Sequence, residues 1–416
     1  MFSNELRIPL EKKLGDDIYK TLEGDILSEI MAEGKIESNP GEYQFVLQGH
    51  SFKALPNLSP GIFGIFQEVV ETLNFTEPIE FYINNSPELN AFALASTEEG
   101  EPHIINFNSG LIQMLTDREL RFVVGHEIGH IISRNANISK LIRFVFPNAR
   151  RIPVLLQHKI ALWDKLAELT ADRYGFIANP EMASCISGFF KISSGLNAER
   201  IRFDFNAYLE ENEQVLTRFR ESGAGNHLSH PINPIRIKAI QLFAASGLYK
   251  SLLDNELPTP DPALEQSLNE LTQTLMIISS SPLDQYRRQF IATAGIVMAN
   301  IDSEMNEDEL NLILNTLSAF TIFPTEYLDG IIKTGKVGDQ MVEAISKILE
   351  INPADRYIMF DMLVSFAHTD HTITRPEISF LFDIGTKMLG MSRKEIAQLI
   401  AGNVQQSFSP QLYGRE

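Results

Sequence analysis

His126, Glu127 and His130 have the residue types and spacing best suited to chemistry, because they form an H-E-x-x-H pattern. Four residues make a little over one helical turn, so on a helix both imidazoles project from one face and can chelate a single ion. Glu127 would lie beside that ion as the general base, not as a ligand. The pattern predicts a zinc hydrolase centre. The alternative is a pair of surface histidines that flank a glutamate.

A catalytic zinc ion takes three protein ligands, so a third ligand is required. Glu168 and Asp172 lie one turn apart in a downstream segment with helical periodicity. We expect Glu168 to be the third ligand of one Zn²⁺ per chain, and Asp172 to accept a hydrogen bond from a ligating imidazole and fix its tautomer. The same spacing also fits a solvated acidic face. Zinc is inferred from the ligand types, and manganese or cobalt could occupy the same cage.

A histidine-bearing loop with His230 precedes a helix whose expected cap is Asn233. His230 or Arg236 could reach the reaction centre and stabilise the oxyanion that forms when a carbonyl is attacked. For Arg236 an equally good interpretation is an ion pair with a carboxylate such as Asp172, which would hold two elements together.

The elements that must position these residues can be read from hydrophobic spacing. Thr116 and Glu119 form a capping box, which predicts the start of the helix that carries His126 and His130. Alternating and helical patterns predict the other elements. Helices are expected over 16–32 and 60–73, and strands over 43–47, 79–83 and 103–107. The fold class is therefore α+β, mainly helical with a small sheet, plus an all-α C-terminal part.

Composition is that of an ordinary globular chain, with 44% hydrophobic and 21% charged residues among 416. The net charge of −19 repels phosphate backbones and anionic lipid surfaces, which argues against nucleic-acid binding. Cys185 is the single cysteine, and the first residues resemble no signal peptide. A cytoplasmic protein with no bilayer-spanning segment is expected, and its oligomeric state is left open.

One segment suggests a peripheral membrane contact. Phe144, Phe146, Leu155 and Leu156 stand among arginines and could rest loosely on a membrane surface. The alternative is that these side chains cover the core or the cleft.

Residues 1–255 resemble zinc metallopeptidases of the HtpX and CAAX prenyl endopeptidase type, a gluzincin family. The likeness rests on four motifs in order, which are Asn90-Ala91-Phe92-Ala93, the H-E-x-x-H helix, Glu168-x-x-x-Asp172, and Ser229-His230-Pro231 followed by Arg236. The resemblance implies a zincin-type peptidase fold in which Asn90 to Ala93 and the strand around Ile105 border the substrate cleft. Because the segment 141–159 is only moderately apolar, the chain is more similar to soluble members.

The C-terminal part begins after a proline-rich linker expected over 256–281, part of which could be one short helix. Residues 299–310 can be laid on residues 367–378, which indicates an internal repeat. The loop aspartates lack a glutamate at the twelfth position, which excludes an EF-hand. Pairs three residues apart predict helix caps instead, at Asn306 with Glu309 and at Thr374 with Glu377.

The repeat at 282–416 resembles the all-helical tellurite-resistance TerB-like domain, which implies an interaction or regulatory module. A metal held by the histidines that flank the second loop aspartate is the less favoured interpretation.

Taken together, these observations predict a soluble zinc metalloendopeptidase that hydrolyses peptide bonds of extended or unfolded polypeptides. The rival hypothesis is a stress-response scaffold or protein-interaction module that binds a metal but is catalytically silent.

Overall fold

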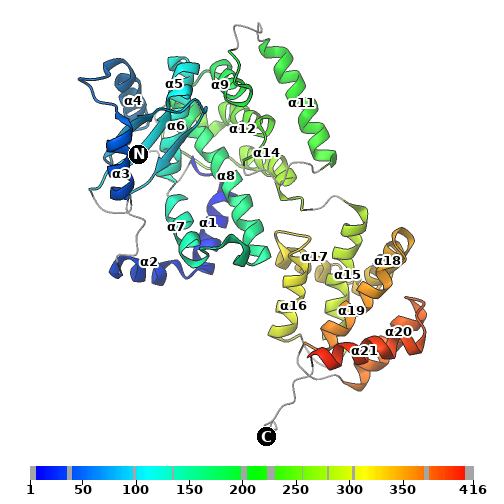
Figure 1. The fold of residues 1–416 in the computed structure, drawn as a ribbon. Helices are drawn as coiled ribbons and strands as arrows, with labels where there is room; N and C mark the ends of the chain where they lie inside the picture. Colours follow the sequence, from blue (N-terminus) through cyan, green and yellow to red (C-terminus); the bar gives the residue numbers. More distant parts are fainter. Residues whose placement is uncertain are drawn as a thin grey trace. The chain divides into compact units, whose positions relative to one another are not determined.

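The chain forms two compact units, Met1–Leu275 and Met276–Glu416 (Figure 1). The computed structural model describes residues 6–34, 40–96, 100–133, 135–197, 204–222, 230–254, 256–278, 281–301, 305–369 and 374–407. The first unit combines many helices with one small sheet, and the second is helical throughout its described residues. The expected fold class, α+β and mainly helical with a helical C-terminal part, is confirmed.

The elements of the first unit follow one another in a mixed order. They are α1 (Pro9–Thr21), α2 (Gly24–Glu33), α3 (Pro40–His50), β1 (Phe52–Lys53), α4 (Pro60–Thr72), β2 (Ile79–Asn84), β3 (Ala91–Leu94), β4 (His103–Asn108), α5 (Ser109–Met114), α6 (Asp117–Ile132), α7 (Asn135–Val145), the 3₁₀ turn η2 (Ala149–Arg151), α8 (Val154–Ala178), α9 (Met182–Ser194), α11 (Phe205–Ser222), α12 (Asn233–Ala245), α13 (Gly247–Leu253), α14 (Pro262–Thr272) and η3 (Gln273–Met276).

The sheet has the strand order β1-β2-β4-β3, with β2 and β4 parallel and the other pairs antiparallel. Phe66 of α4 covers one face, where its ring lies 4.6 Å from that of Phe81 and 4.9 Å from that of Phe107. Leu47 of α3 packs with Tyr82 and Ile104 on the opposite face. Strand β3 is thus left as an edge strand, next to the buried strand β4.

Two of the expected elements differ from the structure. The strand predicted over 43–47 is wrong, because these residues are part of helix α3. Leu47 is buried while Phe45 and Val46 are exposed. A run this short fits one buried helix face as well as it fits a strand. The single helix over 16–32 is two helices, because the backbone turns at Glu23, whose φ is 50°. The helix at 60–73 and the strands at 79–83 and 103–107 are confirmed.

Helices α6 and α8 pack unusually closely along a seam of glycines. A Cβ on Gly125 would lie 2.6 Å from the Cβ of Ala178 and 2.8 Å from the carbonyl oxygen of Tyr174. A Cβ on Gly129 would lie 3.0 Å from the Cα of Ala171. Because backbone atoms occupy this space, only glycine lets the two helices approach so far.

The start of α6 is fixed by the capping box that the sequence predicts. Thr116 Oγ1 accepts from the amide of Glu119, and the Glu119 carboxylate accepts from the amide of Thr116. The same carboxylate is buried and lies 2.8 Å from Lys191 Nζ of α9. Burial would raise the pKa of Glu119, but hydrogen bonds from Lys191 and Thr116 outweigh it and lower the pKa. The cap therefore also ties α6 to α9.

The expected linker over 256–281 contains one short helix, α14, but this helix packs in the first unit, which ends at Leu275 and not before residue 256. Helix α14 buries Leu264, Leu268 and Leu271, and it contacts α12 in the first unit. Asp261 caps this helix and also accepts a hydrogen bond from the amide of Gly247, the first residue of α13. The residues around the prolines before Asp261 lie in no helix or strand, and the helix after them belongs to the first unit.

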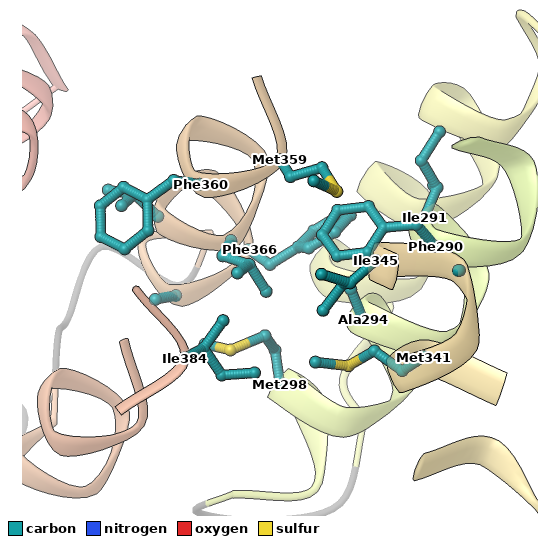
Figure 2. Close-up of a cluster of buried hydrophobic side chains, with 14 of the residues drawn as sticks. Phe290, Ile291, Ala294, Met298, Met341, Ile345, Met359, Phe360, Phe366 and Ile384 are labelled. Carbon is teal, nitrogen blue, oxygen red and sulfur yellow. The ribbon is translucent and has the colours of Figure 1, made fainter. Parts of the chain in front are cut away.

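The second unit is built from α15 (Pro282–Ala299), α16 (Glu307–Leu317), α17 (Pro324–Lys333), α18 (Val337–Ile351), α19 (Asp355–Ala367), α20 (Arg375–Lys387) and α21 (Arg393–Ser407). Figure 2 shows side chains of α15, α18, α19 and α20 meeting in one apolar cluster. Both predicted caps, Asn306 with Glu309 and Thr374 with Glu377, are present as complete capping boxes. Asp302 and Asp370 of the two loops lie outside the described residues.

The glycine seam predicts that Gly125→Ala lowers the free energy of unfolding of the first unit by about 1 to 3 kcal/mol, because the new methyl group overpacks a backbone contact. The matched control is Gly188→Ala, a buried helical glycine of α9 whose added Cβ would have its nearest neighbour at 3.8 Å. That control should be neutral or slightly stabilising. Denaturant unfolding followed by the fluorescence of Trp163, the only tryptophan, measures both. Equal stability of the two variants would contradict the claim that α6 and α8 leave no room for a side chain at Gly125.

The buried pair between Glu119 and Lys191 predicts a pH-dependent loss of stability in Glu119→Gln. At pH 7 the variant should lose about 2 to 4 kcal/mol, because Lys191 keeps a buried charge without its partner. The folded pKa of Glu119 is lowered, so its contribution is complete above the usual pKa of about 4.3 and disappears as the pH falls through the lower folded value. The deficit should therefore shrink between pH 5 and pH 3.

The matched control for that experiment is Glu309→Gln. Glu309 also belongs to a capping box, but no lysine among the described residues pairs with its carboxylate. Its cost should stay at or below about 1 kcal/mol. A deficit in Glu119→Gln that stays constant with pH would show that the charge of Glu119 adds nothing.

Candidate metal centre

The three predicted ligands come together at one point between α6 and α8. The Nε2 atoms of His126 and His130 are 3.1 Å apart. Glu168 Oε2 lies 3.6 Å from His126 Nε2, and Glu168 Oε1 lies 3.3 Å from His130 Nε2. A tetrahedral zinc ion with bonds of about 2.0 to 2.1 Å holds its ligand atoms about 3.3 Å apart. Two imidazole nitrogens and one carboxylate thus have the separation and donor types that zinc requires.

Asp172 occupies the supporting position that the sequence predicts. Its Oδ1 lies 2.9 Å from His126 Nδ1, an arrangement in which the ring donates to the carboxylate and presents Nε2 to the ligand cluster. The carboxylate is fully buried. One turn of α8 therefore supplies both a ligand, Glu168, and the group that orients a ligand of α6.

Arg236 of α12 holds both carboxylates of α8. It donates two hydrogen bonds to Asp172, at 2.8 Å from Nε and 2.6 Å from Nη2, and its Nη1 lies 3.4 Å from Glu168. The guanidinium also stacks 4.7 Å above the ring of Phe189. This geometry favours the structural interpretation of Arg236 over a direct part in the reaction. The expected cap of its helix shifts by one residue, since Ile232 stands at the cap and Asn233 begins the helix.

Burial and charge act in opposite directions on these groups. Burial would raise the pKa of Glu168, but the hydrogen bond from His130 and the charge of Arg236 hold it well below its usual range. The pKa of Asp172 is lowered in the same way. Its burial would raise this pKa, but the charge and hydrogen bonds of Arg236 and the hydrogen bond from His126 outweigh that influence. Burial would lower the pKa of His130, but the hydrogen bond and charge of Glu168 raise it. The cluster keeps its carboxylates ionised.

Glu127 differs from the other two carboxylates. It is 7% exposed, and in the part of the chain that the structure describes no hydrogen bond or ion pair holds its carboxylate. Burial is the largest influence and raises the pKa of Glu127, although His126 and His130 act in the opposite direction. A carboxylate with a raised pKa beside a metal cage is poised to take up and release a proton.

The centre opens into a cavity of about 510 Å³. Glu127, both histidines, Glu168 and Arg236 line it, together with the edge strand and an apolar wall. Asn90, Ala91, Phe92 and Ala93 form the strand side, and Leu111, Phe122, Val123, Phe189 and Ile192 form most of the wall. The cavity therefore has β3, the edge strand of the described sheet, on one side and hydrophobic side chains on another.

Of two further predicted site residues, one lies outside the cavity and the other stands at its rim. Ile105 does not border the cavity: β4 lies between β2 and β3, and Ile105 is fully buried, so its assignment to the substrate is wrong. His230 stands at the rim, with 64% of its side chain exposed and its Nε2 3.9 Å from Glu168. Ser229, which precedes it in the motif, lies outside the described residues.

Several contributors were not identified from the sequence. The apolar wall includes Phe189 and Ile192 of α9, a helix with no motif of its own. Gly125 and Gly129, by contrast, carried a usable signal, because small residues four apart on a helix indicate close approach of another helix.

Comparison with known proteins defines the class. Residues 60–243 match the profile of Peptidase family M48, and this segment contains the edge strand, α6, α8 and Arg236. This match, over 184 of the 416 residues, agrees with the enzyme class expected from the sequence, a metallopeptidase.

Relatives of known name agree with that class. The chain is 28% identical over 219 residues to the plastoglobule-localized metallopeptidase 48 of Arabidopsis thaliana, covering 49% of this chain and 63% of the relative. It is 35% identical over 83 residues to a protease HtpX homolog of Streptococcus uberis, covering 20% of this chain and 27% of the relative. The chain thus spans less than two thirds of either relative, and no solved structure matches it.

Among the described helices, none is both long and apolar enough to cross a bilayer.

The bond between His126 and Asp172 predicts that Asp172→Asn weakens zinc binding by about 10- to 100-fold, because the amide no longer fixes the tautomer of the ring. Competition with a zinc indicator measures the affinity, and Trp163 fluorescence checks the fold. The control is Asp117→Asn, which removes one exposed negative charge at the start of α6. Unchanged affinity in Asp172→Asn would mean that Asp172 does not orient His126.

Proposed function

We propose that this protein is a zinc-dependent metalloendopeptidase that holds one zinc ion per chain. The observation that carries the proposal is the convergence of His126, His130 and Glu168 within 3.6 Å of one another, beside the buried carboxylate of Glu127. A structural zinc site is closed by four protein ligands, whereas a catalytic site keeps a position open. Three ligands that face a cavity fit the second type.

Each residue has a proposed part in the reaction. When bound, zinc would act as a Lewis acid on the scissile carbonyl and lower the pKa of water. Glu127 takes the proton of the attacking water and passes it to the leaving amine. Asp172 and Arg236 are positioning residues that act through His126 and Glu168. His230 at the rim is the proposed donor to the oxygen on which negative charge develops.

The proposed substrate is a polypeptide in an extended or unfolded state. An extended segment can add to the free edge of β3 through backbone hydrogen bonds, and such pairing does not depend on sequence. The apolar wall with Leu111, Phe122 and Ile192 would receive a hydrophobic side chain of that segment. Buried hydrophobic segments become available only when a protein is unfolded, so both features favour unfolded chains.

We propose that the second unit is an interaction or regulatory module similar to TerB-like domains. Its support is the pair of capping boxes at equivalent places, Asn306 with Glu309 and Thr374 with Glu377, which start two similar helices. A cytoplasmic location is likewise proposed, supported by the single cysteine, Cys185, which is a buried free thiol.

Glu127→Gln tests the proposed function. The variant should retain about one zinc per chain, because Glu127 is not a ligand, and lose cleavage of an unfolded protein such as reduced casein by at least about a hundredfold. His130→Ala should lose both zinc and activity, and a chelator should abolish cleavage by the wild type until zinc is restored. Metal analysis and a gel assay with fluorescent substrate read out the three proteins.

Cleavage by Glu127→Gln at the wild-type rate would contradict the assigned base. A wild type that holds zinc but cleaves none of the unfolded proteins and peptides offered would favour the rival hypothesis of a catalytically silent metal-binding scaffold.

A further inference from the structure

The longest segment of the chain without acidic residues begins directly after Glu127 of the H-E-x-x-H motif. Residues 128–163 include six lysines and arginines and no aspartate or glutamate, although 54 of the 416 residues are acidic. At that average density, a segment of this length would hold about five acidic residues. The net charge of −19 therefore hides a local region of the opposite sign.

The centre of this segment is an ordered turn at the surface of the first unit. It joins the end of α7 to the start of α8 (Figure 1). Asn148 accepts hydrogen bonds from the amides of Arg150 and Arg151, and Gln157 donates to the carbonyl of Ile152. The turn is thus held by its own hydrogen bonds, so its side chains are presented on a defined backbone.

Arginines on this turn point to a ligand outside the chain. Arg143, Arg150 and Arg151 are exposed. In the part of the chain that the structure describes, their guanidinium groups form no ion pair. Of the other exposed arginines among the described residues of the first unit, Arg118 and Arg218 each pair with a glutamate, whereas Arg220 forms no ion pair. The positive charge on the turn is therefore uncompensated.

Apolar side chains lie between these arginines. Val145 is 36% exposed and Val154 is 49% exposed, and Phe144, Phe146 and Leu155 are partly exposed. Leu156, by contrast, is 6% exposed and belongs to the core. We name the surface formed by residues 143–155 the α7–α8 turn surface. It combines unpaired guanidinium groups with aromatic and branched side chains in a single turn.

We propose that the α7–α8 turn surface docks on an anionic lipid bilayer. Arginine headgroups would contact lipid phosphates, while the valines and phenylalanines enter the boundary between headgroups and acyl chains. The overall negative charge does not prevent this, because charges further away than about 8 Å are screened at physiological salt. An acidic polypeptide would match the arginines but not the apolar side chains among them.

Docking of this kind would leave the candidate metal centre accessible. Val154 on the turn surface and Glu168 in the metal centre are on the same helix, 14 residues apart, which corresponds to about 21 Å along its axis. Along α8 the turn surface and the metal centre are therefore separated by about four helical turns. The proposal goes beyond the peptidase function and does not depend on it.

Flotation of the full chain with vesicles tests the proposal. We expect binding to phosphatidylcholine vesicles that contain phosphatidylglycerol, little binding to pure phosphatidylcholine vesicles, and weaker binding at higher salt. The triple variant Arg143→Gln, Arg150→Gln and Arg151→Gln should bind anionic vesicles on the order of a hundredfold more weakly, since each basic residue near an anionic surface contributes about fivefold.

A matched control removes three exposed positive charges elsewhere. Arg118→Gln, Arg218→Gln and Lys387→Gln reach the same net charge, and these side chains are 67%, 66% and 71% exposed. This control should bind anionic vesicles nearly as the wild type does. Trp163, which is 1% exposed, reports through its fluorescence that each variant is folded.

A second variant tests the apolar part of the surface. Val145→Ser with Val154→Ser keeps all charges and should bind anionic vesicles several-fold more weakly, including at high salt where the arginines are screened. Since both valines are exposed, this variant should fold as the wild type does.

Three results would overturn the proposal. They are a wild type that binds no anionic vesicles, an arginine triple variant that binds as the wild type does, and binding to polyglutamate without binding to vesicles. The last would assign the surface to an acidic polypeptide. Vesicle binding needs no cleavage, so failure of this proposal leaves the peptidase proposal intact, and the reverse also holds.

Discussion

The close approach of α6 to α8 is the constraint on which the rest of the first unit depends. The two histidines come from one helix and the carboxylates of Glu168 and Asp172 from the other, so the distance between the helices sets the distance between the ligands. Ordinary helix pairs are 8 to 10 Å apart, with side chains filling the space between them. Gly125 and Gly129 remove those side chains where the helices meet. The residues that permit the site are thus neighbours of the residues that form it.

Charge balance is the second consequence of this arrangement. The centre gathers the carboxylates of Glu127, Glu168 and Asp172, and among the described residues the charge that meets them is the buried Arg236 with two imidazoles. Arg236 compensates Asp172 and Glu168, while no described residue forms a hydrogen bond or ion pair with the carboxylate of Glu127. Burying an uncompensated carboxylate costs several kcal/mol, so such groups persist where they serve a reaction. A divalent cation between the imidazoles would supply the missing positive charge.

The sequence allowed the chemistry of the site to be predicted better than its surroundings. His126, His130, Glu168 and Asp172 follow helical spacing, which is local, so their faces can be deduced from residue numbers alone. The capping box at Thr116 is equally local. The assignment of Ile105 to the substrate cleft was wrong, because the order of strands in a sheet depends on contacts between distant segments. Those contacts put β4 inside the sheet and β3 at its edge. The apolar wall was missed for the same reason.

Short elements show where secondary structure cannot be predicted from the sequence. Residues 43–47 alternate as a strand does, but five residues cannot distinguish that pattern from one face of a helix. The prolines near 258 correctly marked a break between two helices, yet they gave no information on which unit the next helix joins. That choice depends on Leu264, Leu268 and Leu271 packing in the first unit, and hydrophobic spacing shows only that such a face must be buried somewhere.

The central claim is that three side chains from two helices bind one ion. An anomalous difference map recorded at the zinc edge, from crystals of the full chain grown with zinc, tests this most directly. The account predicts one strong peak at about 2.0 to 2.2 Å from Nε2 of His126, Nε2 of His130 and a carboxylate oxygen of Glu168. A map with no peak between these three residues, or with zinc bound elsewhere while Glu168 faces away, would contradict it.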